Sequence, residues 1–158
     1  MARRYWLFKS EPSSFSVDDL LGAPGRTTCW EGVRNYQARN LLRDNVKKGD
    51  GVFFYHSGAR PSGVAGICVV TRSGYPDDSA QDPNSGYHDP RATGGNPIWY
   101  MVDIRLARKF TNVVPLSLIR NTPGLENMVL CRKGNRLSIQ PVAPSEWRLI
   151  QRLAGTLR

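Results

Sequence analysis

The residues best suited to chemistry lie together in residues 28–39, which read TCWEGVRNYQAR. Trp30 offers a large flat ring for stacking, and Gly32 permits a positive φ or the close approach of another group. A helix is expected to begin near Asn35, and the N–H groups of its first turn bind anions. This combination suits a planar, polar, negatively charged ligand such as a nucleotide. The alternative is structural, with Trp30 as a core anchor and Gly32 in an ordinary turn.

The charge of the chain favours a polyanionic partner. Its 158 residues include 22 Lys and Arg against 13 Asp and Glu, which gives a net charge of +9. Most of the basic residues are Arg, whose planar group pairs with phosphate through two hydrogen bonds and stacks on bases. Nucleic acid is therefore the first expectation. An Arg-rich composition that serves only solubility is the alternative.

Composition also limits the class of protein. Apolar residues make up 40% of the chain, which is enough for one domain with a real core. No apolar run approaches the roughly 20 residues needed to cross a bilayer, and charge returns too soon after the start for a secretory signal. We expect a soluble intracellular protein with no membrane contact. The expected location is the cytoplasm of a bacterium, with the nucleoid as an alternative, or the nucleus if the source is a eukaryote.

The cysteines and a group of aspartates are the candidate metal ligands of the chain. The three cysteines are widely spaced and form no CxxC pair, so we expect free thiols and no structural zinc. They are Cys29, Cys68 and Cys131. Four aspartates cluster further along the chain, but their spacing does not match a Ca²⁺ loop, and we expect solvated acids and no bound metal. They are Asp77, Asp78, Asp82 and Asp89.

Strands and short helices must position these residues. Strands are expected over residues 5–9, 52–57, 64–71, 98–110 and 136–142. Helical segments are expected over residues 16–21, from about 35 to 45, and over 114–119, 125–130 and 144–154. Ser16 and Asp19 have the spacing of a helix cap. Because the strands do not alternate regularly with helices, the pattern predicts an α+β fold built on a small mixed barrel.

Residues 75–97 differ from the rest of the chain. They are rich in Asp, Pro, Gly and Ser and show no hydrophobic period. Long connections inside compact domains are often binding loops, so we assign this segment as a lid over the ligand pocket. A mobile acidic loop with no role is the alternative.

Several short motifs, in order along nearly the whole chain, resemble the EVE domain and, among EVE domains, the thymocyte nuclear proteins. The first two read YWLFKSEP and WEGVRNYQAR. The motifs cover residues 5–12, 30–39, 49–50, 53–57, 75–77, 89–90, 99–103, 115–118 and 137–142. Each motif is short, but their number and order make the resemblance specific.

The resemblance implies a PUA-like fold, with short helices around a small mixed β-barrel, and a single EVE domain over residues 1–158. This fold is related to the YTH and ASCH domains, which are nucleic-acid modules. YTH domains hold a methylated adenine in an aromatic pocket, and EVE-like domains are linked to modified cytosines in DNA. The resemblance thus implies a non-enzymatic reader, without cofactor, that flips a modified base of DNA or RNA into an aromatic pocket. Methylated or hydroxymethylated cytosine is the first expectation for that base.

For such a reader, the contacts can be assigned to particular side chains. Trp30 would stack on the base, and Ser10 and Asn35 would hydrogen-bond its edge. The wall of the pocket is assigned to Tyr55, His56, Ser57, Trp99 and Gln140. The contacts to the phosphate backbone are assigned to Lys9, Arg34 and Arg39.

His56 raises the alternative of an enzyme, because a Cys–His pair with Cys29 would make a nucleophile. Adjacent residues of a strand point to opposite faces, however, so His56 and Ser57 cannot both enter one pocket. The sequence contains no Gly-x-Ser-x-Gly elbow, Walker loop or His-Glu-x-x-His motif. We therefore expect binding without catalysis.

Two other binding classes stay open. A PUA-type RNA-binding module without selectivity for modified bases would bind mainly through phosphate, and its affinity would fall steeply with salt. A sensor of a small nucleotide-like ligand would bind the monomer as well as any polymer. For the oligomeric state, a monomer is favoured.

Overall fold

Strand β1 (Tyr5–Ser10) runs through the middle of the fold, because both of its faces are apolar. Trp6 and Phe8 point to one side of the sheet and Leu7 to the other, and all three are buried. β1 pairs in parallel with β3 (Gly51–His56) and antiparallel with β6 (Ile139–Val142). This computed structural model describes residues 3–157.

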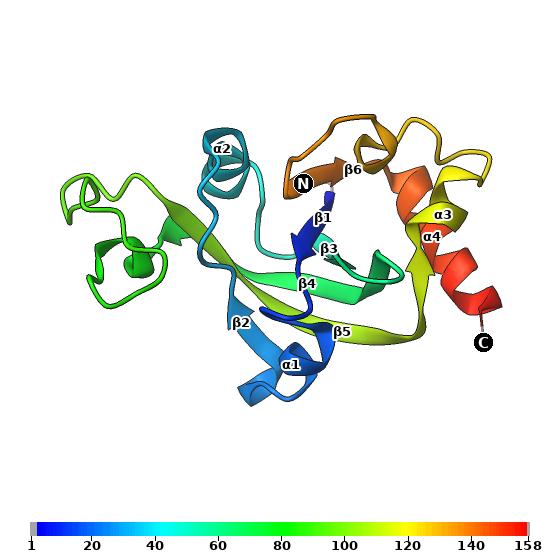
Figure 1. The fold of residues 1–158 in the computed structure, drawn as a ribbon, viewed down its shortest axis with the longest axis horizontal. Helices are drawn as coiled ribbons and strands as arrows, with labels where there is room; N and C mark the ends of the chain where they lie inside the picture. The colour runs from blue at the N-terminus through cyan, green and yellow to red at the C-terminus, as the bar shows by residue number, and fades with distance from the viewer. Residues whose placement is uncertain (1–2, 158) are drawn as a thin grey trace.

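The sheet has six strands in the order β2-β5-β4-β3-β1-β6 (Figure 1). Its longest members are β4 (Gly63–Pro76) and β5 (Tyr100–Pro115), which pair antiparallel, and β2 (Thr27–Cys29) lies at the edge beside β5. The helices are α1 (Val17–Leu21), α2 (Tyr36–Asp44), α3 (Leu116–Arg120) and α4 (Pro144–Thr156). Short 3₁₀ turns cover Pro24–Arg26, Asp78–Gln81 and Val129–Cys131.

Two hydrophobic clusters lie on opposite faces of the sheet. The first cluster contains side chains from α1 and α2, together with Trp30 and with Ile139 of β6. Trp30 follows the edge strand β2, and Ile139 lies on the other edge strand, β6. Because both residues belong to this cluster, the sheet curls around it. The second cluster is covered by α3 and α4 and contains Trp147. α4 and the segment that joins β4 to β5 lie at opposite ends of the molecule (Figure 1).

The predicted α+β, PUA-like fold is confirmed, and most predicted elements are present. Ser16 caps α1 in a capping box with Asp19, and α2 and α4 lie close to their predicted bounds. The predicted helix over residues 114–119 begins later, at Leu116, because β5 continues to Pro115. The predicted turn over residues 125–130 is replaced by the 3₁₀ turn Val129–Cys131, and β6 is shorter than predicted.

Strand β2 was not predicted, because its three residues give no alternation. The register between β4 and β5 shifts near Gly66. None of the helices in residues 3–157 has both the length and the apolar character needed to span a membrane.

Candidate functional site

A cavity of about 450 Å³ opens where β1 ends. Its walls come from residues 9–11 and 14–15, from residues 28–34, and from Tyr87 and Ser138. Four regions far apart in sequence therefore meet at this point. The volume lies within the range of pockets that hold small ligands.

Trp30 forms part of the cavity wall and also belongs to the first hydrophobic cluster. Its ring lies 5.4 Å from that of Phe8 in a tilted arrangement and 5.5 Å from that of Phe54 edge to face. Only 8% of the residue is exposed. Among residues 3–157, no aromatic ring stacks in parallel on this indole. Trp30 is thus a core anchor that also borders the cavity.

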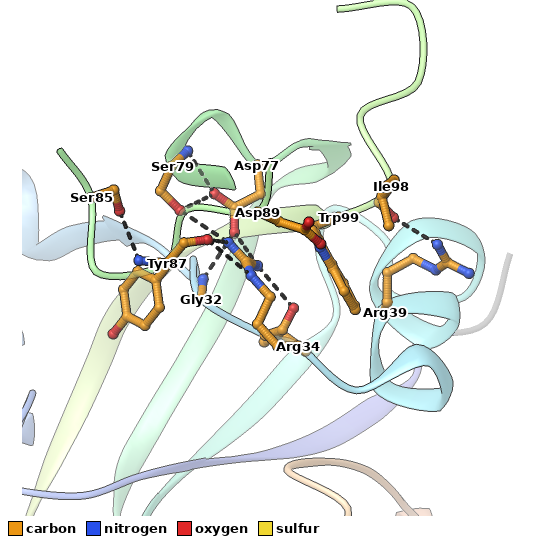
Figure 2. Close-up of polar contacts among 11 residues, drawn as sticks. Gly32, Arg34, Arg39, Asp77, Ser79, Ser85, Tyr87, Asp89, Ile98 and Trp99 are labelled. Carbon is orange, nitrogen blue, oxygen red and sulfur yellow. Dashed lines mark hydrogen bonds and ion pairs between the residues drawn. The ribbon is translucent and has the colours of Figure 1, made fainter. Parts of the chain in front are cut away.

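The buried carboxylate of Asp77 ties residues 32–34 to the segment that follows β4 (Figure 2). It accepts hydrogen bonds from the backbone N–H of Gly32 (2.9 Å), from Nη1 of Arg34 (3.1 Å) and from Ser79. Burial alone would raise the pKa of Asp77, but the hydrogen bonds from Ser79, Gly32 and Arg34 lower it. The expectation that Asp77 is a solvated acid is therefore wrong, because its carboxylate is enclosed and fully used.

Arg34 also fixes Tyr87, which forms the far wall of the cavity (Figure 2). Its Nη2 and Nε atoms donate to the carbonyl oxygen of Tyr87 at 2.7 and 3.2 Å. The Tyr87 ring covers Gly32, where a Cβ atom would lie 2.5 Å from Cε1 of the ring. With a φ of +82°, Gly32 serves both the turn and this close approach.

The end of the same segment is held by α2 and by Asp89. Nη1 of Arg39 donates to the carbonyl oxygen of Ile98 at 2.6 Å, and the Trp99 ring stacks on that of Tyr36. Nε1 of Trp99 donates to Asp89 at 2.8 Å. Hydrogen bonds from Arg91 and Trp99 hold the pKa of Asp89 well below its usual range. Residues 75–97 are thus ordered by polar contacts, although they contain little regular structure.

Four of the residues assigned from sequence meet in the cavity wall. They are Lys9, Ser10, Trp30 and Arg34. The hydroxyl of Ser10 donates to the carbonyl oxygen of Phe15 at 2.6 Å, so only its capacity to accept a hydrogen bond remains for a ligand. Burial lowers the pKa of Lys9.

The other assigned residues lie outside the cavity wall. They are Asn35, Arg39, Tyr55, His56, Ser57, Trp99 and Gln140. The side chain of Asn35 caps α2 by accepting from the N–H of Ala38, and Nε2 of His56 accepts from the N–H of Val17. Tyr55 belongs to the second hydrophobic cluster, and buried Gln140 donates to the carbonyl oxygen of Leu137.

Cys29 borders the cavity, whereas His56, its expected partner in a nucleophilic pair, lies outside the cavity wall. Burial, with the charges of Glu31 and Asp103, raises the pKa of the Cys29 thiol, which stays protonated at neutral pH. The ring nitrogen of His56 that could act as a base is occupied by Val17. Within residues 3–157, no group of three or more His, Cys, Asp or Glu side chains has the arrangement of a metal site.

The family model of the EVE domain matches residues 4–153 of this chain. The chain belongs to the EVE domain family. Human thymocyte nuclear protein 1 is 40% identical to this EVE domain over 92% of this chain and 72% of that protein. The resemblance predicted from the motifs is thereby confirmed.

Solved structures resemble this EVE domain over nearly its whole length. A hypothetical protein from Leishmania major has a TM-score of 0.93 and 42% identity, and covers 99% of this chain and 97% of its own. The human THYN1 protein in complex with DNA that contains 5-methylcytosine has a TM-score of 0.87 and 39% identity. That likeness covers 96% of this chain and 97% of the human one.

Proposed function

We propose that this EVE domain binds a nucleic-acid strand and holds one modified base in the cavity beside Trp30. The observation that carries the proposal is an indole without a stacked partner in the wall of a cavity of about 450 Å³. The complex of the human THYN1 protein with 5-methylcytosine-containing DNA supports a methylated cytosine as the ligand.

The energetics require more than stacking. Flipping a base out of a duplex costs a few kcal/mol, and stacking on an aromatic side chain returns about 1–3 kcal/mol. A buried methyl group adds about 0.8 kcal/mol, which is less than tenfold in affinity. Hydrogen bonds in the cavity and contacts to phosphate must supply the remainder. The fixed wall formed by Tyr87 adds selectivity through shape.

The phosphate backbone would contact the two basic side chains that border the cavity. Lys9 and Arg34 lie in its wall, and the chain carries a net charge of +9. Arg34 and Arg39 have a second role, because both hold residues 75–98 in place through carbonyl oxygens. We propose that this segment covers the cavity as a lid and that these contacts hold it in one position. Binding without catalysis agrees with a protonated Cys29.

A matched pair of tryptophan variants tests the proposal. Trp30→Leu and Trp147→Leu each remove an indole and keep an apolar side chain, but only Trp30 borders the cavity. We expect Trp30→Leu to weaken binding of an oligonucleotide with one 5-methylcytosine by about 5- to 150-fold, the equivalent of about 1–3 kcal/mol. Trp147→Leu should bind as the wild type does, per folded molecule. Fluorescence anisotropy measures affinity, and circular dichroism measures the folded fraction.

Each class of ligand gives a different result in this experiment. Binding of methylated and plain oligonucleotides should be compared at two salt concentrations and against competing mononucleotide. Equal affinities for methylated and plain oligonucleotides, with a steep salt dependence, would indicate a general PUA-type RNA-binding module and not a reader of modified bases. Full competition by the mononucleotide would indicate a sensor of a small nucleotide-like ligand. Unchanged affinity of Trp30→Leu would refute the role of the cavity.

A further inference from the structure

Glu31 is the acidic side chain of the cavity wall that lies between Trp30 and Gly32. We propose that its carboxylate selects a base with an exocyclic amino group, as in cytosine or adenine, over one with a carbonyl oxygen there, as in thymine or uracil. This inference rests on the proposed function and adds a rule for which bases the cavity accepts.

The carboxylate of Glu31 has unused capacity to accept hydrogen bonds. Among residues 3–157, no side chain or N–H group donates to it, and no cation pairs with it. The nearest cation, Arg34, already donates to Asp77 and to the carbonyl oxygen of Tyr87. A ligand that brings an N–H donor therefore finds an acceptor without competition from the protein.

The surroundings of Glu31 strengthen the demand for a donor. Burial raises the pKa of Glu31, the negative charge of Asp77 raises it further, and Arg34 offsets part of the shift. The side chain as a whole is nonetheless exposed, and a hydrogen bond from a ligand would stabilise this carboxylate and offset the rise in its pKa. The carbonyl oxygen of a base would instead meet a second acceptor, and two acceptors face to face repel each other.

The chemistry of the bases makes this selection measurable. Cytosine presents an amino group at position 4, and a carboxylate is its usual partner. Thymine and 5-methylcytosine carry the same methyl group and both present a flat ring, but thymine has an oxygen at position 4. Stacking on Trp30 is therefore similar for both bases, and the polar edge alone distinguishes them.

Glu11 supplies a matched control. Its carboxylate also borders the cavity, but its side chain lies against the turn at Gly58, where a Cβ atom would be 3.7 Å from Cγ and Cδ of Glu11. Glu11→Gln and Glu31→Gln remove the same charge from the same cavity. A loss due only to charge would be common to both variants.

The experiment compares oligonucleotides that differ only in one central base, 5-methylcytosine, cytosine or thymine. We expect the wild type to bind 5-methylcytosine about 5- to 150-fold more tightly than thymine, the usual range for one well-placed polar contact to a base. In Glu31→Gln, whose amide both donates and accepts, this ratio should fall to within about threefold. In Glu11→Gln the ratio should persist.

The outcomes separate this inference from the proposed function. An unchanged ratio in Glu31→Gln, or equal loss of the ratio in both variants, would overturn the role of Glu31 while base binding stands. The role of Glu31 would also be overturned if the wild type prefers 5-methylcytosine to cytosine but binds 5-methylcytosine and thymine equally. A wild type that binds none of the oligonucleotides would overturn the proposed function itself. Because Glu31 is exposed, Glu31→Gln should melt at the wild-type temperature.

Discussion

Trp30 and Trp147 are exposed to a similar extent, 8% and 6%, yet their surroundings differ. Trp147 stacks on Phe53 at 4.1 Å and on Tyr5 at 4.5 Å. A Cβ atom at Gly51 would lie 2.7 Å from its ring. Within the described residues, the aromatic neighbours of Trp30 are tilted or edge to face, and Trp30 borders the cavity.

The comparison shows that burial alone does not separate an anchor from a binding surface. The second hydrophobic cluster provides Trp147 with stacked partners and leaves no place for a ligand ring. The first cluster provides Trp30 with ring edges, so the stacking capacity of the indole is unused. The experiments below test this contrast, from the largest expected effect to the smallest.

Trp147→Ala should have the largest effect, and on stability alone. Removing a buried indole from a packed cluster costs about 3–5 kcal/mol of the free energy of unfolding. Urea unfolding followed by circular dichroism measures this loss. Affinity for the methylated oligonucleotide, corrected for the folded fraction, should not change, and a specific loss of affinity would break the contrast between the two tryptophans.

Asp77→Asn should destabilise the cavity side of the molecule. The change removes a buried charge that accepts from Gly32, Arg34 and Ser79, and hydrogen bonds to a charged group contribute about 1.5–3 kcal/mol each. We expect faster hydrogen exchange at the Gly32 amide and weaker binding. Asp78→Asn is the control, because Asp78 is exposed and adjacent. Equal behaviour of the two variants would show that the buried carboxylate does not hold the wall.

Gly32→Ala and Gly49→Ala form the sharpest pair. Both glycines have a positive φ, +82° and +94°, so an alanine costs about 1–2 kcal/mol of stability at either position. Only at Gly32 would the new Cβ atom meet Tyr87, since no atom lies within 4 Å at Gly49. We expect similar melting temperatures, and an affinity about fivefold lower or more in Gly32→Ala alone. Equal affinities would mean that Tyr87 is no part of the binding surface.

His56 should give the smallest effect, a dependence of the free energy of unfolding on pH. Burial lowers the pKa of His56; among the charges that face it, Asp18 raises the pKa and Lys109 lowers it. Because the folded pKa lies below the unfolded value of about 6.5, the unfolded state binds more protons between the two values. The stability contributed by neutral His56 is therefore complete above about pH 6.5 and is lost as pH falls from there toward the folded pKa.

Urea unfolding of the wild type and of His56→Gln at pH 7 and pH 5 measures this dependence. The variant, whose amide oxygen still accepts from Val17, should lose less stability over this interval. His88→Gln, in the exposed part of residues 75–97, should behave as the wild type. An equal loss of stability between pH 7 and pH 5 in the wild type and in His56→Gln would show that His56 does not cause the pH dependence.

Local features of the fold could be predicted from the sequence. The cap formed by Ser16 and Asp19, the start of α2 near Asn35 and the apolar face of α4 all follow from neighbouring residues. The end of β5 could not be predicted, because its last residues resemble the start of a helix and pairing with β4 decides their conformation.

The site was predicted only in part, for a physical reason. Four residues assigned from the sequence lie together in the cavity wall, since they belong to the first two motifs: Lys9, Ser10, Trp30 and Arg34. Asp77 and Tyr87 were missed, because a contact between Gly32 and a residue 45 positions later exists only once the sheet has formed. The signal that could have found them was the need for a glycine at position 32.

The pairing of β1 with β6 has a consequence for synthesis on the ribosome. β1 is the first strand to emerge, and β6 at Ile139–Val142 is the last. One edge of β1 therefore lacks its partner until nearly all of the polypeptide has been translated, and an unpaired edge invites association with other chains. Nascent chains that stall before Val142 should consequently be prone to aggregation and sensitive to proteases, even when their earlier strands have paired.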